Sequence, residues 1–242
     1  MTPMRNKIIS SIDLKYFPVQ PNNKLLDFGF GEGHKTIEFA KLGVKVTAAD
    51  INQKNINRLI RVMPKSLKKI ISTTKLAKNK KLPLRGNRFD GIVINEVLEH
   101  IDNTEFILSE LHRILKKKGY ICISVPTFNS AFVFNKLNPA YKDYSGHVHI
   151  FKEHELLALL KKNGFAIKHI TYINFQFAMF WLIQSIFKVN PTQNGTLNSK
   201  ARLDKIYWKF WGVLHILHLS ESLINIGNHV FPKIIYIYAK KK

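Results

Sequence analysis

The sequence predicts an α/β fold, a doubly wound, Rossmann-like sheet of seven mostly parallel strands with helices on both sides. Three observations predict it. Apolar runs of strand length alternate with amphipathic helical segments. The apolar runs lack a polar face, as expected of strands that helices cover on both sides. The first strong run leads into a glycine-rich turn and then into a helix.

The individual elements follow from apolar periodicity and from capping residues. The strands are expected over residues 24–28, 44–49, 69–73, 89–95, 120–125, 165–173 and 234–239. The helices are expected over about residues 4–17, 34–42, 53–63, 104–118 and 153–163. Asn52 and either Asn103 or Thr104 are the expected N-caps of two helices, and Gly119 is expected to end the fourth.

The last quarter of the chain departs from this alternation. Residues 175–189 are almost wholly apolar and aromatic but too short to span a bilayer, and a second aromatic stretch covers about 202–226 after a polar linker. We therefore divide the chain into a core over residues 1–174, a helical insertion over 175–231, and a last core strand with a basic tail over 232–242. The insertion is expected either to pack as a lid or pocket wall, or to lie in a membrane interface.

The formal net charge is +22, from 38 Lys and Arg against 16 Asp and Glu. This excess favours polyanionic partners, nucleic acid or an anionic membrane surface, unless it reflects a lysine-rich composition bias alone. The sequence lacks an arginine-aromatic nucleic-acid module, which makes nucleic acid the less favoured partner. The single cysteine, Cys122, excludes an internal disulfide and a metal site built on a cysteine pair. The N-terminus lacks the apolar core of a signal peptide, so a cytoplasmic location is expected.

Residues 25–33 read LLDFGFGEG and carry the clearest functional signal. Alternating glycines let the backbone bend sharply and let a ligand lie against bare main chain. The helix that follows points its free N–H groups into the same turn. Asp27 at the strand tip would repel a pyrophosphate and attract an ammonium group. The turn is therefore expected to bind a cationic, nucleoside-like ligand.

In the order and spacing of its motifs, the chain resembles the class I S-adenosylmethionine-dependent methyltransferases, in the broad group that includes the ubiquinone-biosynthesis O-methyltransferases. The resemblance covers about residues 22–170 and the last strand. It is carried by residues 25–33, Asp50, residues 82–83, 88–95, 96–101 and 111–119, and residues 146–147 before the helix that follows Phe151. It implies S-adenosylmethionine as cofactor and a last strand that is antiparallel to the others.

The resemblance also implies a set of cofactor-binding residues: Asp27, Gly29, Gly31, Gly33, Asp50, Ile51, Asn95 and Glu96. The three glycines would lie under the methionine and ribose part of the cofactor. Asp27 would hold its amino group, through water, and Asp50 would accept both ribose hydroxyls. The alternatives are that Asp27 is an ordinary turn residue and that Asp50 caps a helix.

The sequence departs from the family pattern where the adenine amine would bind. Family members often carry an acidic residue a few positions before the Leu-Pro pair, whereas residues 75–81 are largely basic here. The adenine contact is therefore left to the backbone, to Asn79 or to another residue.

A second constellation, Glu96, Glu99 and His100, follows the fourth strand. Residues at i, i+3 and i+4 can share one face of a helical turn. Two carboxylates and an imidazole suit a divalent cation such as Mg²⁺, Mn²⁺ or Zn²⁺, with His147 or His149 as a further ligand. The sequence here is similar to that of metal-using O-methyltransferases with a Glu-x-x-Glu-His motif, in which the cation lowers the pKa of the acceptor hydroxyl. The alternatives are that His100 acts as a general base without metal, or only packs.

These features predict a methyltransferase that uses S-adenosylmethionine and forms an O-methyl product. The expected acceptor is a small-molecule, lipid-like or glycan-linked hydroxyl. The expected location is the cytoplasm, with peripheral attachment to the inner face of the membrane. Two alternatives stay open: an RNA methyltransferase, favoured by the charge, and a non-catalytic, membrane-associated relative, favoured by the missing acidic residue.

Overall fold

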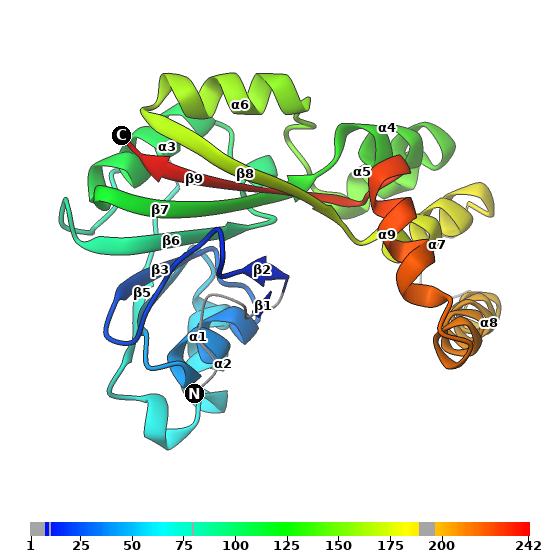
Figure 1. Ribbon diagram of the computed structural model, residues 1–242, viewed down its shortest axis with the longest axis horizontal. Coiled ribbons are helices and arrows are strands. Elements are labelled where there is room, and N and C mark those ends of the chain that lie inside the picture. Colours follow the sequence, from blue (N-terminus) through cyan, green and yellow to red (C-terminus); the bar gives the residue numbers. More distant parts are fainter. Residues whose placement is uncertain (1–7, 10, 79, 189–196) are drawn as a thin grey trace. The chain divides into compact units, whose positions relative to one another are not determined.

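Seven strands of the computed structural model form one mixed sheet in the order β5-β4-β3-β6-β7-β9-β8 (Figure 1). The structure describes residues 8–9, 11–78, 80–188 and 197–242. The strands are β3 (Lys24–Phe28), β4 (Lys45–Asp50), β5 (Ile71–Lys75), β6 (Phe89–Asn95), β7 (Leu115–Pro126), β8 (Phe165–Ile173) and β9 (Ile234–Lys241). The pairs β3–β4, β3–β6, β4–β5 and β6–β7 are parallel, whereas β9 runs against β7 (Figure 1). The predicted doubly wound sheet with an antiparallel last strand is confirmed.

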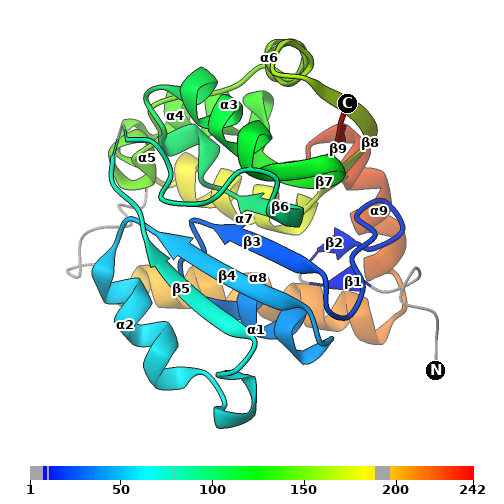
Figure 2. The ribbon, with the colours of Figure 1, turned by 90° about the vertical axis from the view of Figure 1, so that its left-hand side faces the viewer.

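Helices flank this sheet, and α1 and α3 lie on opposite faces of it (Figure 2). The α-helices are α1 (His34–Lys41), α2 (Gln53–Val62), α3 (Thr104–Ile114), α4 (Phe128–Leu137), α5 (Pro139–Ser145), α6 (Glu153–Lys162), α7 (Phe175–Ile186), α8 (Leu197–Ile216) and α9 (Ser220–Val230). Two short 3₁₀ helices are η2 (Lys65–Leu67) and η3 (Leu98–His100). The predicted N-caps Asn52 and Asn103 are confirmed, because their side chains accept hydrogen bonds from the N–H groups of Lys54 and Phe106.

The middle of the sheet is buried on both faces. Ile92, Val93 and Ile94 follow one another on β6, and each exposes at most 1% of its surface. Because successive residues on a strand point to opposite faces, three buried residues in a row require cover on both sides. The lack of a polar face in the predicted strands therefore reflects the two helical layers.

Two sequence predictions about element type and length are wrong. In place of a helix over 4–17, the described residues form a hairpin of β1 (Ile8–Ile9) and β2 (Ile12–Asp13), with Ser11 between them at a φ of +73°. Ile9 and Ile12 are both buried, so burial follows the strand pairing and not a helical face. Residues 1–7 and 10 lie outside the described residues.

The second error concerns Gly119, which does not end α3. The helix ends at Ile114, and β7 begins at the next residue because Leu115 pairs with Phe89 of β6. The register then shifts between Phe89 and Gly91. The helices α4 and α5 were not predicted from the sequence.

The chain divides into two compact units. The first contains residues 1–125, 154–171 and 236–242, and the second contains residues 126–153 and 172–235. The second unit holds the helical insertion, α7 to α9, together with α4 and α5. Phe134, Tyr141 and Ala178 form its buried core. Of the expected polar linker over about 190–200, residues 189–196 lie outside the described residues, and α8 begins at Leu197.

Among the described residues, none of the helices combines the length and apolar character needed to cross a bilayer.

Candidate active site

The carboxyl ends of β3, β4 and β6 meet at one edge of the sheet. The chain runs outward from β3 through β4 to β5 and then returns to β6 on the other side of β3. Doubly wound sheets bind their ligands beyond the strand ends at such a reversal of strand order. The loops after these three strands begin at Gly29, Ile51 and Glu96. The structure therefore brings the predicted cofactor residues together within the first unit.

The glycine turn after β3 has a packed side and an open side. A Cβ atom on Gly29, whose φ is +70°, would lie 2.5 Å from Cγ2 of Val97 in the loop after β6. A Cβ atom on Gly31, whose φ is +54°, would meet no atom within 4 Å. Glycine is therefore needed at the first position for close packing, and at the second the main chain is open to a ligand.

Asp50 ties the glycine turn to the start of α2. Its Oδ2 atom accepts hydrogen bonds from the Gly31 N–H and from the Asn55 side-chain amide, both at 3.1 Å. Its Oδ1 atom accepts a hydrogen bond of 2.7 Å from the Asn52 N–H. The helix cap is the side chain of Asn52, so the alternative role of Asp50 as a helix cap is wrong. The carboxylate is held beside the open side of the turn, and its contact with a ribose stays a prediction.

Asp27 is buried behind the same turn. Its side chain is 2% exposed, and its Oδ2 atom accepts a hydrogen bond of 2.6 Å from the Thr36 hydroxyl. Burial raises the pKa of Asp27 to about 6, although the Thr36 hydrogen bond and the charge of Lys35 lower it. A cation brought close to such a carboxyl group would stabilise its ionised form and offset the cost of burying the charge. This supports the predicted role toward an ammonium group. The bond to Thr36 was not predicted from the sequence.

Asn95 ends β6 with its side chain fixed by two hydroxyl groups. Its Oδ1 atom accepts hydrogen bonds from Ser124 at 2.9 Å and from Tyr236 at 2.6 Å. Burial raises the pKa of the Tyr236 hydroxyl, so it stays protonated and remains a donor. Glu96 follows with a φ of +52°, a backbone conformation that residues other than glycine rarely adopt. Strained backbone of this kind is frequent at functional sites, which agrees with the predicted place of both residues.

The adenine side of the predicted site carries an exposed apolar residue. Ile51 directly follows Asp50 and is 53% exposed, so it can pack against the flat face of a base. In the basic segment that replaces the expected acidic residue, Lys78 forms an ion pair of 2.9 Å with Asp102. Asn79, the predicted alternative for the adenine contact, lies outside the described residues.

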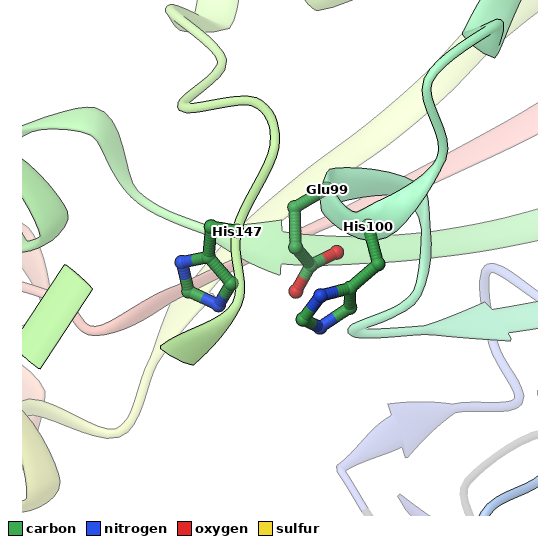
Figure 3. A group of neighbouring side chains, drawn as sticks. All are labelled: Glu99, His100 and His147. Carbon is green, nitrogen blue, oxygen red and sulfur yellow. The ribbon is translucent and has the colours of Figure 1, made fainter. Parts of the chain in front are cut away.

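Glu99 and His100 project from η3, directly after the Glu96 turn (Figure 3). A ligand atom of the Glu99 carboxylate and one of the His100 ring lie within 4.8 Å of each other. Glu99 is buried and His100 is exposed. The expected helical turn shared by all three residues is wrong, because Glu96 precedes η3 in a left-handed conformation. His147 belongs to the second unit, and its role as a metal ligand stays a prediction.

A family model described as a methyltransferase domain matches residues 4–170. The chain belongs to this methyltransferase family. Named relatives support the same activity, and together with the fold they show an S-adenosylmethionine-dependent methyltransferase.

Three proteins similar to this methyltransferase act, by their names, on three kinds of atom. A ubiquinone biosynthesis O-methyltransferase of Pelagibacter ubique is 28% identical over 194 residues, which cover 72% of this chain and 76% of that protein. A ubiquinone/menaquinone biosynthesis C-methyltransferase of Cronobacter sakazakii is 31% identical over 54% of this chain and 52% of that protein. The structure of phosphoethanolamine N-methyltransferase 2 of Haemonchus contortus with S-adenosylmethionine covers 94% of this chain and 50% of that one, with a TM-score of 0.62. At 17% identity, this last likeness shows the shared fold alone.

Substituting Gly31 should separate cofactor binding from folding. Because the added Cβ atom meets open space, Gly31→Ala should lose only about 1 kcal/mol of stability from its positive φ angle. The methyl group would occupy the ligand's side of the turn, so the affinity for S-adenosylmethionine should fall at least tenfold. Calorimetric titration and denaturant unfolding measure the two effects.

The matched control is Gly43→Ala. Gly43 also has a positive φ, +79°, and an added Cβ atom would lie 3.4 Å from Cβ of Pro21, an ordinary contact distance. It should show a similar stability loss with unchanged cofactor affinity. Cofactor binding by Gly31→Ala at the affinity of the unsubstituted protein would contradict the open-side assignment.

Asp27→Asn should show that the buried carboxyl group costs stability when it ionises. The folded-state pKa of about 6 exceeds the ordinary value of 3.8, so this group's stabilising contribution is complete below pH 4 and is lost as the pH rises through 6. The stability of the variant relative to the unsubstituted protein should therefore increase between pH 4 and pH 7.5 by roughly 2–3 kcal/mol. Denaturant unfolding of the cofactor-free protein at both pH values gives this difference. A difference that does not change with pH would reject the raised pKa.

Proposed function

We propose that the protein transfers the methyl group of S-adenosylmethionine to a hydroxyl oxygen of a small-molecule, lipid-like or glycan-linked acceptor. The cofactor, when bound, supplies a methyl group already activated by a sulfonium sulfur, so positioning and exclusion of water provide most of the rate. The observation that carries the proposal is the exposed His100 ring beside the buried Glu99 carboxyl group, directly after the strained turn that ends the cofactor residues. The similarity to an O-methyltransferase of quinone biosynthesis supports the choice of oxygen.

His100 is the proposed general base. As the acceptor oxygen bonds to the methyl carbon and the carbon–sulfur bond breaks, the hydroxyl proton passes to a ring nitrogen of His100. Its position supports this role, because the N–H of His100 bonds to the Val97 carbonyl oxygen and so fixes the residue at the end of the β6 loop. The neighbouring Glu99 carboxyl group would stabilise the imidazolium that forms.

A divalent cation is an alternative way to activate the acceptor at the same residues. The Glu99 carboxylate and the His100 imidazole are suitable oxygen and nitrogen ligands for Mg²⁺, Mn²⁺ or Zn²⁺. Such an ion would lower the pKa of an acceptor hydroxyl. Glu96, the third predicted ligand, lies outside η3, so we give preference to the metal-free base.

An apolar hollow within the second unit supports an acceptor with a hydrocarbon part. Its volume is about 470 Å³, within the range of small-molecule sites. It lies among α7, α8 and α9 and is lined by Phe175, Met179, Ile183, Ile206, Tyr207, Phe210, Trp211, Leu214 and Leu223. The Tyr207 hydroxyl donates a hydrogen bond to the Gln176 carbonyl oxygen, so the polar group of this lining residue is satisfied within the protein. A prenyl or acyl chain is the ligand chemistry that such walls favour.

We also propose that the helical insertion attaches the protein to the cytoplasmic face of an anionic membrane. On α8, Ile206, Phe210 and Val213 are all at least 46% exposed and follow the i, i+4, i+7 spacing of one helical face. On α9, Leu223, Ile226 and Val230 are each at least 43% exposed and follow the i, i+3, i+7 spacing of one helical face. Two apolar stripes of this kind on a chain with a net charge of +22 favour a negatively charged lipid surface as the occupant. The two alternatives named above, RNA modification and loss of catalysis, have no comparable support among the described residues.

The catalytic proposal is tested by transfer of labelled methyl groups from S-adenosylmethionine to two phenols, one with a short prenyl chain and one without. We expect transfer to the hydroxyl of the prenylated phenol with the lower KM, as a lipid-like acceptor requires. His100→Gln should lower kcat by 10²- to 10⁴-fold while leaving the affinity for S-adenosylmethionine unchanged.

His154→Gln, which alters an exposed histidine of α6, is the control and should have normal kcat. Running the assay with a chelator decides between the two forms of activation, because only metal-assisted transfer would be lost. Normal kcat in His100→Gln would rule out His100 as the base.

Membrane attachment is tested by co-sedimentation with phosphatidylglycerol vesicles. Ile226→Glu should reduce pelleting at least fivefold, because it places a charge in the apolar stripe of α9. Asn225→Glu changes the net charge equally at the adjacent exposed residue, outside the stripe, and should pellet almost as the unsubstituted protein does. Equal pelleting of the two variants would reject docking through α9 and leave charge alone as the cause.

A further inference from the structure

A basic hollow lies at the amino end of the parallel strands, the edge of the sheet opposite to the glycine turn. It is lined by Lys24, Arg85, Gly86, Asn87, Arg88 and Lys116, and its volume is about 590 Å³. Lys24 is the first residue of β3, Arg88 immediately precedes β6, and Lys116 is the second residue of β7. The hollow therefore belongs wholly to the first unit and takes no part in the cofactor site.

The cations of this hollow outnumber the carboxylates available to them. Asp90 is the acidic partner nearby: its Oδ1 atom binds Lys116 Nζ at 2.6 Å, and its Oδ2 atom accepts the Lys24 N–H at 2.8 Å. Between residues that the structure describes, no ion pair involves the side chain of Lys24, Arg85 or Arg88. Like charges gathered around one space repel each other, and a bound anion would relieve that repulsion.

The loop that carries the two arginines is held by a partly buried ion pair on α3. Glu110 and Arg113, both on α3, bind each other at 2.7 and 2.8 Å. Arg113 donates further hydrogen bonds to the carbonyl oxygens of Leu84 at 3.1 Å and Leu82 at 3.3 Å. Glu110 accepts the Leu82 N–H at 2.8 Å. The loop backbone before Arg85 is thereby fixed through charge-assisted bonds, which are stronger than neutral ones.

The far end of the loop is fixed as well. The N–H groups of Asn87 and Arg88 donate to the carbonyl oxygens of Arg113 and Ile114, at 3.1 and 2.8 Å. Asn87 takes a left-handed conformation with a φ of +51°, which Asn tolerates better than most residues. The Arg88 guanidinium lies 5.4 Å from the centre of the Phe89 ring, a cation–π distance that orients it. The backbone that carries both arginines is thus held at its two ends, and both residues are exposed.

We propose that this hollow binds a phosphate group carried by a small molecule. Arginine presents a planar fork of N–H donors that matches phosphate oxygens, and two arginines with two lysines suit a dianion better than a single carboxylate. The volume exceeds what one phosphate ion needs and leaves space for the group attached to it. The rigid support of the loop reduces the entropy lost on binding.

The test is calorimetric titration with inorganic phosphate and with pyrophosphate, at constant ionic strength. The unsubstituted protein should bind one equivalent of pyrophosphate with a submillimolar Kd, and inorganic phosphate more weakly. Arg85→Gln and Arg88→Gln should each weaken binding at least tenfold. Arg61→Gln removes an exposed arginine of α2 outside the hollow and should change the Kd less than twofold. All variants should bind S-adenosylmethionine normally, so failure here does not touch the methyltransferase assignment.

A second arm separates the source of the phosphate. If the ligand is a lipid headgroup, Arg85→Gln will weaken binding to phosphatidylglycerol vesicles while soluble phosphates bind weakly. If the ligand is a soluble phosphate ester, Arg85→Gln will pellet with vesicles as the unsubstituted protein does and will lose pyrophosphate binding. Equal losses in all three arginine variants, or no saturable binding of either ligand form at millimolar concentration, would overturn the proposal.

Discussion

The hydrogen bond between the Asp50 carboxylate and the Gly31 N–H is the contact on which the cofactor edge of the sheet depends. It joins the end of β4 to the turn after β3, where Phe28 already pairs with Ala49 and the Gly29 N–H bonds to the Ala49 carbonyl oxygen. A carboxylate that is 5% exposed is tolerated only when donors surround it, and Asp50 has three. The group that would meet the ribose therefore also shapes the turn beneath the methionine part. If Asp50 binds the ribose as predicted, one side chain would serve both binding and local structure.

Asp27, unlike Asp50, is a predicted cofactor-binding residue that lowers the stability of the folded protein. Although the hydroxyl and the backbone of Thr36 both bond to it, this buried carboxyl group ionises reluctantly, and its raised pKa means that its charge destabilises the folded state at neutral pH. An Asn of the same shape could keep the bond to Thr36 without that cost. The presence of an ionisable group at this position is understandable if a cation neutralises it in the liganded protein. The residue is better explained by binding than by stability.

Most of the core could be predicted from sequence because its signals are local. The runs that form β3, β6 and β8 show their bounds in the residues themselves, and Asn52 and Asn103 cap α2 and α3. Contacts that join distant segments left no such signal. The bond from Tyr236 to Asn95 spans 141 residues, and no periodicity points to it. The hairpin at Ile9 and Ile12 was mistaken for a helix because a few apolar residues in a short segment fit either period. The early end of α3 was missed for a related reason, because the pairing of Leu115 with Phe89 overrides the local signal of Gly119.

The family match and the two units together bear on the proposed acceptor. The methyltransferase model covers residues 4–170, so α7, α8 and α9 all fall beyond it. The proteins similar to this chain are named for methylation of oxygen, carbon and nitrogen, so the shared fold alone does not fix the acceptor atom. Because a sulfonium methyl group needs little chemical assistance, the choice of acceptor is set by what is held in line with it. The apolar hollow and the exposed stripes are concentrated in the part of the chain that the shared model does not reach. The proposed lipid-like acceptor and lipid surface would account for that concentration of apolar surface more directly than a polar polymer would.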